Sequence, residues 1–348
     1  MPKTIGIIDA DLLDNGTRHP NLALMKISGY QKELGNDVTL LEDYYSIPKY
    51  DEVYLSRVFD FTNVPIDPKN YPNLHIGGTG FFWMTAPDLP LEVEHHMPDY
   101  HLYDEYVGRQ IARGIKPQTY SDYMDYSIGF TTRGCFRKCP FCVNQKYDHV
   151  FRHSPVKEFF DPSRKHIYLW DDQFFGFPKW QEVLDELDET GRRFQFRQGL
   201  DVRLMTEEKA RRLANVKYHG DYIFAFDHIN EAEQVVRGLK IWRRHSDKST
   251  KLYVLSGYES QGAEEIASIF ERIRILMEYQ CLPYIMRHEY YNRSPYKGMF
   301  ITLARWCNQP SFLKKKSFRQ FCEANGLTSS AFRYICLLYT SDAADEGL

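Results

Sequence analysis

The sequence predicts an α/β fold in two parts, a small open sheet followed by a longer series of strand–helix units. The length of 348 residues corresponds to about two domains. Patterns of buried strands alternate with amphipathic helices along most of the chain, which is typical of α/β proteins. The hydrophobic fraction of 43% and the charged fraction of 26% are ordinary for a globular chain, so the composition excludes a fibrous or low-complexity protein.

The first part of the chain has the pattern of a small open α/β sheet. Its expected elements are strands at 4–12, 37–41, 52–59 and 74–78 and a helix at 20–34. Pro20 can occupy the first turn of that helix, and Gly35 stops it. The Pro- and His-containing stretch 97–117 is expected to connect this sheet to the next domain.

A second alternating series begins near residue 124. Its expected strands are at 126–132, 166–170, 193–196, 222–226, 252–255 and 282–286, and its expected helices are at 180–190, 207–214, 231–244 and 263–279. Thr206 is the expected N-cap of the helix at 207–214. Polar or glycine residues follow each strand, and the C-terminal ends of barrel strands are where active sites collect. We therefore expect domains at 1–120 and 121–300, followed by a helical extension at 301–336.

Charge and hydropathy restrict the class of protein. Lys and Arg number 44 and Asp and Glu number 47, so the net charge of −3 gives no global basic field for a nucleic acid or a membrane surface. No apolar run approaches the ~20 residues that span a bilayer. Residues 1–6 lack the apolar region of a signal peptide. We expect a soluble, cytoplasmic protein without membrane contact.

Three of the seven cysteines are clustered. Cys135, Cys139 and Cys142 lie within eight residues, directly after an expected strand. This spacing should arise by chance roughly 0.003 times in a chain of this composition. The other four, which are expected to be buried small hydrophobic residues, are Cys281, Cys307, Cys322 and Cys336. An odd, sparse set of cysteines argues against a disulfide scaffold, so the cluster indicates a metal or redox site.

Three thiolates on one loop are compatible with three kinds of site. A closed zinc site needs a fourth ligand, which His149 or His153 could supply. A dithiol redox motif of Cys139 and Cys142 would leave Cys135 unused. A [4Fe–4S] cluster bound by three cysteines keeps one iron open for an exogenous ligand, and this alternative fits the spacing best.

The pattern Cys135-x3-Cys139-x2-Cys142, with Phe141 before the third cysteine, resembles the radical S-adenosylmethionine (SAM) superfamily. The likeness covers residues ~124 to ~290, and the whole chain resembles the subset with an N-terminal cobalamin-binding-like domain. It implies a flavodoxin-like front sheet followed by a partial (β/α)6 TIM-type barrel. It also implies a [4Fe–4S] cluster and SAM, which is cleaved to a 5′-deoxyadenosyl radical that abstracts hydrogen from a substrate. The implied partners are a low-potential electron donor such as flavodoxin or ferredoxin and an unassigned substrate, whether small molecule, peptide or RNA.

The resemblance also suggests residues that bind SAM at the ends of strands. Asp171 or Asp172 would accept hydrogen bonds from the amino group of SAM, although the glycines that usually precede such a carboxylate are absent. Arg203 could reach its carboxylate, and Gly257 would lie beside adenine. The alternative for each is a structural role at a strand end, such as an ion pair.

The front domain departs from true cobalamin binders. Those proteins carry an Asp-x-His-x-x-Gly loop. Here Asp9 is followed by Ala-Asp-Leu-Leu-Asp, which has no histidine at the corresponding position. His19 is nearby but precedes Pro20 in an unsuitable context. We therefore expect that cobalamin is not bound.

A zinc-stabilised nucleic-acid-binding module is the alternative function. It would use the cysteine cluster together with the basic run at 314–316, which is expected on a single helix at 312–321 with interleaved aromatic residues. The last stretch, 337–348, has the composition of a non-native tail and is expected to carry no function.

Overall fold

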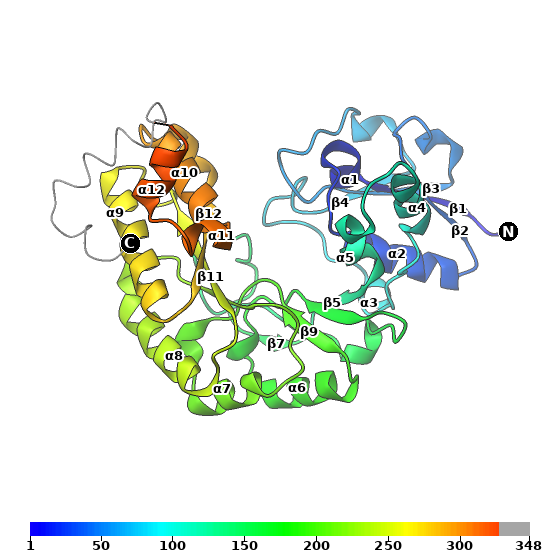
Figure 1. Cartoon of the computed structure of the whole chain (residues 1–348). Helices are drawn as coiled ribbons and strands as arrows, with labels where there is room; N and C mark the ends of the chain where they lie inside the picture. Colours follow the sequence, from blue (N-terminus) through cyan, green and yellow to red (C-terminus); the bar gives the residue numbers. More distant parts are fainter. Residues whose placement is uncertain (327–348) are drawn as a thin grey trace. The chain divides into compact units, whose positions relative to one another are not determined.

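The computed structural model describes residues 1–326 and shows a mixed α/β protein with parallel sheets, which confirms the α/β class that the sequence predicts (Figure 1). The expected tail at 337–348 and Cys336 lie outside the described residues. Contacts divide the chain into two compact units. Unit 1 comprises residues 1–172 and 179–194, and unit 2 comprises residues 173–178 and those from 195 onward.

Unit 1 begins with a four-stranded parallel sheet of order β2-β1-β3-β4. Its strands are β1 (Thr4–Asp9), β2 (Asp37–Leu40), β3 (Glu52–Ser56) and β4 (Leu74–Gly77). All four were predicted, although β1 ends earlier because the Asp9 side chain accepts a hydrogen bond from Leu12 N at 3.2 Å and starts a helix. Ile5 and Ile7 on β1 share a buried apolar cluster with Leu24.

Helices and short 3₁₀ segments surround this sheet. They are α1 (Ala10–Asn15), α2 (Leu22–Glu33), α3 (Leu91–Glu94), α4 (Asp104–Ala112), α5 (Ser121–Met124), η1 (Ile47–Lys49), η2 (Pro68–Asn70) and η3 (Pro117–Tyr120). The stretch 97–117, which was expected to connect this sheet to the next domain, contains α4. Val107 of this helix is 4% exposed and packs into the core of the front sheet together with Tyr103.

The second half of unit 1 carries the strands that lead to the cysteines. Strands β5 (Tyr126–Gly129) and β8 (His166–Leu169) pair in parallel, and β9 (Arg193–Phe196), which begins in this unit, completes the order β5-β8-β9. A short antiparallel ribbon joins β6 (Thr132–Arg133) to β7 (Phe151–Arg152). The expected single strand at 126–132 is therefore two strands. Helix α6 (Trp180–Glu189) and η4 (Val156–Glu158) complete the unit.

Unit 2 holds a parallel sheet of order β10-β11-β12. Its strands are β10 (Tyr222–Ala225), β11 (Thr250–Ser256) and β12 (Leu282–Arg287), and its principal helices are α7 (Glu207–Ala214), α8 (Ala232–His245), α9 (Ala263–Glu278) and α10 (Lys297–Cys307). Its 3₁₀ segments are η5 (Phe174–Gly176), η6 (Val202–Leu204), η7 (Ile229–Glu231) and η8 (Glu289–Arg293). Thr206 Oγ1 accepts from Lys209 N at 3.2 Å, so the predicted N-cap of α7 is confirmed.

The basic run near the C-terminus does not lie on one helix, contrary to our expectation. Two short helices, α11 (Pro310–Leu313) and α12 (Phe318–Ala324), flank residues 314–316, which are exposed between them. The break occurs because Ser317 caps α12, accepting from Gln320 N. Phe318 and Phe321 are buried, so these aromatic rings serve the core and offer no stacking surface for a nucleic acid.

None of the helices within residues 1–326 combines the length and the apolar character that a membrane span requires.

The carboxyl group of Asp9 gives the front sheet a predicted pH dependence. The residue is 1% exposed, and burial raises its pKa to about 6, although the Tyr103 hydroxyl donates to it at 2.8 Å. A carboxyl whose pKa is higher in the folded than in the unfolded chain stabilises the fold below the unfolded pKa and loses this contribution as pH rises. We expect the free energy of unfolding to fall by about 2–3 kcal/mol between pH ~4 and ~6 because of Asp9 alone.

The Asp9→Asn variant tests this expectation, because asparagine cannot ionise. Denaturation by urea, followed by circular dichroism between pH 4 and 7, should show a shallower pH dependence than in the wild-type chain. Asp227, whose pKa burial likewise raises to about 6, is present in both proteins and drops out of the comparison. Identical pH profiles for the two proteins would contradict the assignment.

Candidate functional site

The three clustered cysteines lie on one loop that is closed at its base. Strands β6 and β7 pair Thr132 with Arg152 and Arg133 with Phe151, and residues 134–150 form the loop between them. Gly134 enters the loop with a φ of +86°, and a Cβ atom there would lie 2.2 Å from the His149 carbonyl oxygen. The chain can therefore close this loop only with glycine at position 134.

Polar side chains within the loop satisfy its backbone carbonyl groups. The Gln145 amide donates to the carbonyl oxygens of Cys139 at 2.6 Å and Cys142 at 3.0 Å. Lys138 Nζ donates to the carbonyl oxygens of Gln145 and Tyr147, each at 2.8 Å. Neither side chain was predicted, because nothing in the amino-acid sequence distinguishes a Gln or Lys that holds a loop from one in solvent.

Backbone amides are directed at two of the three sulfur atoms. Arg137 N donates to Cys135 Sγ and Asn144 N donates to Cys142 Sγ, both at 3.3 Å. Such N–H groups stabilise negative charge on sulfur and are one means by which proteins tune iron–sulfur clusters. Within residues 1–326, no three or more His, Cys, Asp and Glu side chains are grouped as metal ligands. The structure therefore places the three cysteines on one loop, but their thiols do not converge on a common point as the ligands of a bound metal would.

The chemistry of the donor set fits an iron–sulfur cluster better than zinc. Three thiolates match three irons of a [4Fe–4S] cluster, whereas a structural zinc site requires a fourth protein ligand. His149 is largely exposed and contacts Asp148 at 2.8 Å. His153 Nε2 lies 3.1 Å from Glu94 Oε1, and its Nδ1 lies 3.0 Å from Ser154 Oγ. Both histidines that were considered as a fourth zinc ligand thus contact other groups, and His153 does so through both of its ring nitrogens.

Asp171, which follows β8, is buried beneath the base of the loop. Its side chain accepts four hydrogen bonds, from the backbone N–H and the hydroxyl of Thr131 and from the same two groups of Thr132, at 2.5–3.1 Å. Burial raises the pKa of this carboxyl, while the four hydrogen bonds act in the opposite direction. The two threonines are contacts that the sequence analysis did not predict, although adjacent hydroxyl residues before a cysteine were a visible signal.

Asp172 lies beside Asp171 but faces the entry of the loop. Its Oδ2 accepts from Gly134 N at 2.8 Å and lies 3.4 Å from Arg133 Nε. The side chain is 15% exposed, in contrast to the buried Asp171. The structure thus brings together both predicted carboxylates and the cysteine loop within unit 1.

Arg203 belongs to unit 2 and is bound by two carboxylates. Its Nε and Nη2 donate to the two oxygens of Asp201 at 2.7 and 2.9 Å, and its Nη1 contacts Glu231. Burial lowers the pKa of Arg203, but the hydrogen bonds and charge of Asp201 outweigh it, so that the pKa is raised overall. These contacts correspond to the structural ion pair that the sequence analysis kept as an alternative.

Gly257, also in unit 2, forms the turn after β11. Its φ is +73°, and a Cβ atom would lie 2.8 Å from the Cβ of Tyr291. Its N–H donates to Glu265 Oε1 at 3.2 Å, and Glu265 also pairs with the buried Arg272 at 3.2 Å. The glycine is therefore required by the local backbone and by close packing.

The isolated cysteines that the structure describes are buried, as predicted. Cys281 is 3% exposed, Cys307 is 1% exposed and Cys322 is fully buried. Burial raises the pKa of the Cys322 thiol to about 11 and raises that of Cys307 as well. Thiols with a raised pKa are poor nucleophiles and poor metal ligands, so these three described cysteines are unsuited to either role.

At the carboxyl ends of β1 and β3 in the front sheet, polar side chains bond to one another. The Asn21 amide donates to Ser56 Oγ at 2.8 Å, and the Tyr103 hydroxyl donates to Asp9 Oδ2. His19, the nearest histidine to the first strand in the sequence, lies 2.5 Å from Asp122. The position between the first and third strands of such a sheet is where open α/β sheets commonly bind ligands.

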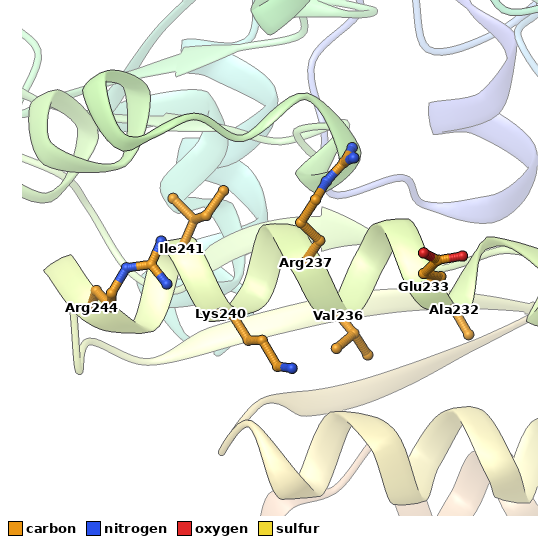
Figure 2. Close-up of a pocket in the computed structure, with 7 residues that line it drawn as sticks. All are labelled: Ala232, Glu233, Val236, Arg237, Lys240, Ile241 and Arg244. Atoms are coloured by element: carbon orange, nitrogen blue, oxygen red, sulfur yellow. The ribbon is translucent and has the colours of Figure 1, made fainter.

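A surface depression runs along α8, and none of the predicted site residues lines it. Its volume is about 570 Å³, and seven residues line it: Ala232, Glu233, Val236, Arg237, Lys240, Ile241 and Arg244. Figure 2 shows the charged ends of Arg237 and Lys240 pointing in different directions from the helix. Because these cations diverge, they do not converge on one point where they could bind an anion together.

Comparisons with known proteins gave matches among solved structures alone. No family model matches the chain. No curated protein matches it. A structure of TsrM, a radical SAM methyltransferase from Kitasatospora setae with cobalamin and a [4Fe–4S] cluster bound, has a TM-score of 0.55 and 12% identity, covering 82% of this chain and 75% of that chain. TsrM with its tryptophan substrate and a SAM analogue bound has a TM-score of 0.53 and 13% identity, covering 81% and 72%. At this identity the likeness shows a shared fold.

Proposed function

We propose that this chain, which has the fold of a radical SAM methyltransferase, is itself a radical SAM enzyme. The observation that carries the proposal is the loop at 134–150, which holds Cys135, Cys139 and Cys142 on a closed base after β5. Bound there, a [4Fe–4S] cluster would supply the electron that cleaves SAM to methionine and a 5′-deoxyadenosyl radical. The radical would abstract hydrogen from a substrate that the proposal leaves unassigned.

The residues of the loop would hold the cluster and stabilise its charge. The three cysteine thiolates are the ligands in this proposal. The N–H groups of Arg137 and Asn144 already donate to two of the sulfur atoms, which supports a site built for anionic sulfur. The loop's own side chains satisfy its carbonyl groups, which favours a loop that stays ordered around its ligands.

Among the residues predicted to bind SAM, the contacts favour Asp172. Both contacts described for Asp172 use Oδ2, so we assign its Oδ1 to the amino group of SAM. Arg203 is paired with Asp201 and Glu231, which favours a supporting role for this residue over direct binding of the SAM carboxylate. Gly257 is proposed to keep the turn after β11 narrow enough for adenine to approach.

The architecture that we propose has a flavodoxin-like sheet at 1–120, a partial (β/α)6 barrel at 121–300 and a helical extension at 301–336. The order β2-β1-β3-β4 is that of the first four strands of a flavodoxin-like sheet, which supports the first assignment. Strands β5, β8, β9, β10, β11 and β12 would supply the six barrel strands. The implied partner is a low-potential donor such as flavodoxin or ferredoxin, in the cytoplasm.

Cobalamin is a point on which the fold neighbour and our prediction differ. The TsrM structure contains cobalamin, whereas we predicted that this chain does not bind it. Our prediction rests on the missing histidine after Asp9, and the contact of His19 with Asp122 is in keeping with it. The proposed reaction, reductive cleavage of SAM, does not require cobalamin.

Anaerobic reconstitution followed by a cleavage assay tests the proposal. Protein incubated with iron and sulfide should retain about four irons per chain, because three cysteines suffice for a [4Fe–4S] cluster. After addition of SAM and titanium(III) citrate, mass spectrometry should detect methionine and 5′-deoxyadenosine in equal amounts, slowly even without the substrate.

Two results would overturn the proposal. One is retention of a single zinc per chain without sulfide, which would instead support the zinc-stabilised module. The other is a fully loaded cluster that yields no 5′-deoxyadenosine in cell extract that supplies the physiological substrate and electron donor. Val143→Ala is the control for substitutions of the loop cysteines and should retain the cluster, because Val143 is 40% exposed, lies beside Cys142 and has no metal-binding group.

A further inference from the structure

The base of the cysteine loop is held by carboxylates from the neighbouring strand. Backbone N–H groups of Thr131, Thr132 and Gly134 all donate to carboxylate oxygens that follow β8. Asp171 receives the first two and Asp172 the third. Three of the four residues that precede Cys135 are therefore fixed to one strand end, so that the carboxylates set the register of the loop against β8.

Asp171 is occupied by the loop and closed to solvent. It accepts four hydrogen bonds from the two threonines, three at Oδ1 and one at Oδ2, and the residue is only 3% exposed. Oδ1 is therefore saturated, and the amino group of SAM could reach the buried Oδ2 only if the surrounding loop moved and displaced the donors that it provides. A displaced buried N–H or hydroxyl would lose its partner, which is unfavourable.

The front sheet contains the same arrangement at a place without cysteines. Asp11, also 3% exposed, follows β1 and accepts from Val58 N at 2.7 Å, Phe59 N at 3.3 Å and Thr62 Oγ1 at 2.5 Å in the loop after β3. Two buried aspartates thus fix two different loops in the same way. Asp11 therefore provides a control of matched burial, position and hydrogen bonding.

We infer that Asp171 is a positioning residue that clamps the base of the cysteine loop and so keeps the three thiols ready for the cluster, and that it does not bind SAM. The inference rests on the proposed function for the identity of the cluster. The clamp itself is a property of the polypeptide and can be measured without any metal.

Hydrogen exchange of the metal-free chain is the first measurement, made on wild type, Asp171→Asn, Thr131→Val and Asp11→Asn. Asp171→Asn replaces one acceptor oxygen by a donor, so the amides at 131 and 132, which donate to Asp171, should exchange about 10- to 100-fold faster. Thr131→Val removes only one hydroxyl donor and keeps a similar shape, so its effect should be smaller and in the same segment. Asp11→Asn should increase exchange in the loop at 57–63 and leave the cysteine loop unchanged.

Cluster retention and SAM affinity are the second measurement, made on reconstituted protein. Release of iron to a chelator should be about 10- to 100-fold faster in Asp171→Asn than in wild type or Asp11→Asn. The affinity of the remaining loaded protein for SAM, measured by equilibrium dialysis, should be unchanged. Thr131→Val provides the test if Asp171→Asn does not fold.

The outcomes separate the clamp from its alternatives. Unchanged exchange and iron release with weakened SAM binding would show that Asp171 is a SAM ligand and overturn the inference. Equal loosening of the cysteine loop in Asp171→Asn and Asp11→Asn would show a general effect on folding and overturn it as well. If wild type binds no iron, the proposed function fails, while the exchange measurement still decides whether the clamp exists.

Discussion

Replacing any one of Cys135, Cys139 or Cys142 with serine should abolish the iron–sulfur absorption of the reconstituted protein and its cleavage of SAM. Each cysteine is expected to bind a different iron, and the loop has no spare thiol that could substitute for a missing one. Serine keeps the size of the side chain while removing the sulfur ligand. The iron content should fall from about four atoms per chain to a trace amount, and 5′-deoxyadenosine should be undetectable.

The buried cysteines provide the control for this experiment. Cys281→Ala and Cys307→Ala remove thiols that are 3% and 1% exposed in unit 2, and both variants should retain the cluster in the fraction that folds. Equal loss of iron from the loop variants and from these two would contradict the assignment of the ligands. Circular dichroism before reconstitution separates a loss of iron from a loss of folding.

Gly134→Ala should cause the second-largest loss, although position 134 is not a ligand. Its φ of +86° is unfavourable for alanine, and the added Cβ would meet the His149 carbonyl oxygen at 2.2 Å. Because that oxygen belongs to the backbone, relief requires the two ends of the loop to separate. We expect iron retained after desalting to fall about tenfold or more, since opening the base disperses the three thiols.

Gly191→Ala isolates the steric part of this effect. Gly191 has a similar φ of +69°, but no atom lies within 4 Å of the position that its Cβ would occupy. The control should lose about 1–2 kcal/mol of stability from backbone strain and keep its iron. If both glycine variants lost iron to the same extent, the contact with His149 would not be the cause.

The strands and the cysteines of this chain were predictable because each has a local signal. Buried strands show as short apolar runs, and the spacing of Cys135, Cys139 and Cys142 is rare by chance. The sequence also located Asp171 and Asp172 at a strand end. It could not distinguish a carboxylate that binds a ligand from one that binds the adjacent loop, because both kinds stand in the same place and the difference depends on contacts about 40 residues away.

The errors in the sequence analysis have a similar origin. The first strand was extended to residue 12 because Ala and Leu continue its apolar pattern, yet the cap formed by Asp9 ends it. A single helix was expected at 312–321, but Ser317 and Gln320 form a capping box that starts a new helix there. In both cases one side-chain hydrogen bond to the backbone outweighed the hydrophobic periodicity.

The ribbon of β6 and β7 has a consequence for the order of events during synthesis. The contacts that close and clamp the cysteine loop come from its own residues, from Arg152 and from the two aspartates at 171 and 172. All of them lie in the first half of the 348-residue chain, with the two aspartates about 40 residues from their partners. Because chains fold from the N-terminus as they emerge from the ribosome, the loop can take its shape before most of unit 2 has been translated. Insertion of the cluster would then not have to wait for the release of the finished polypeptide.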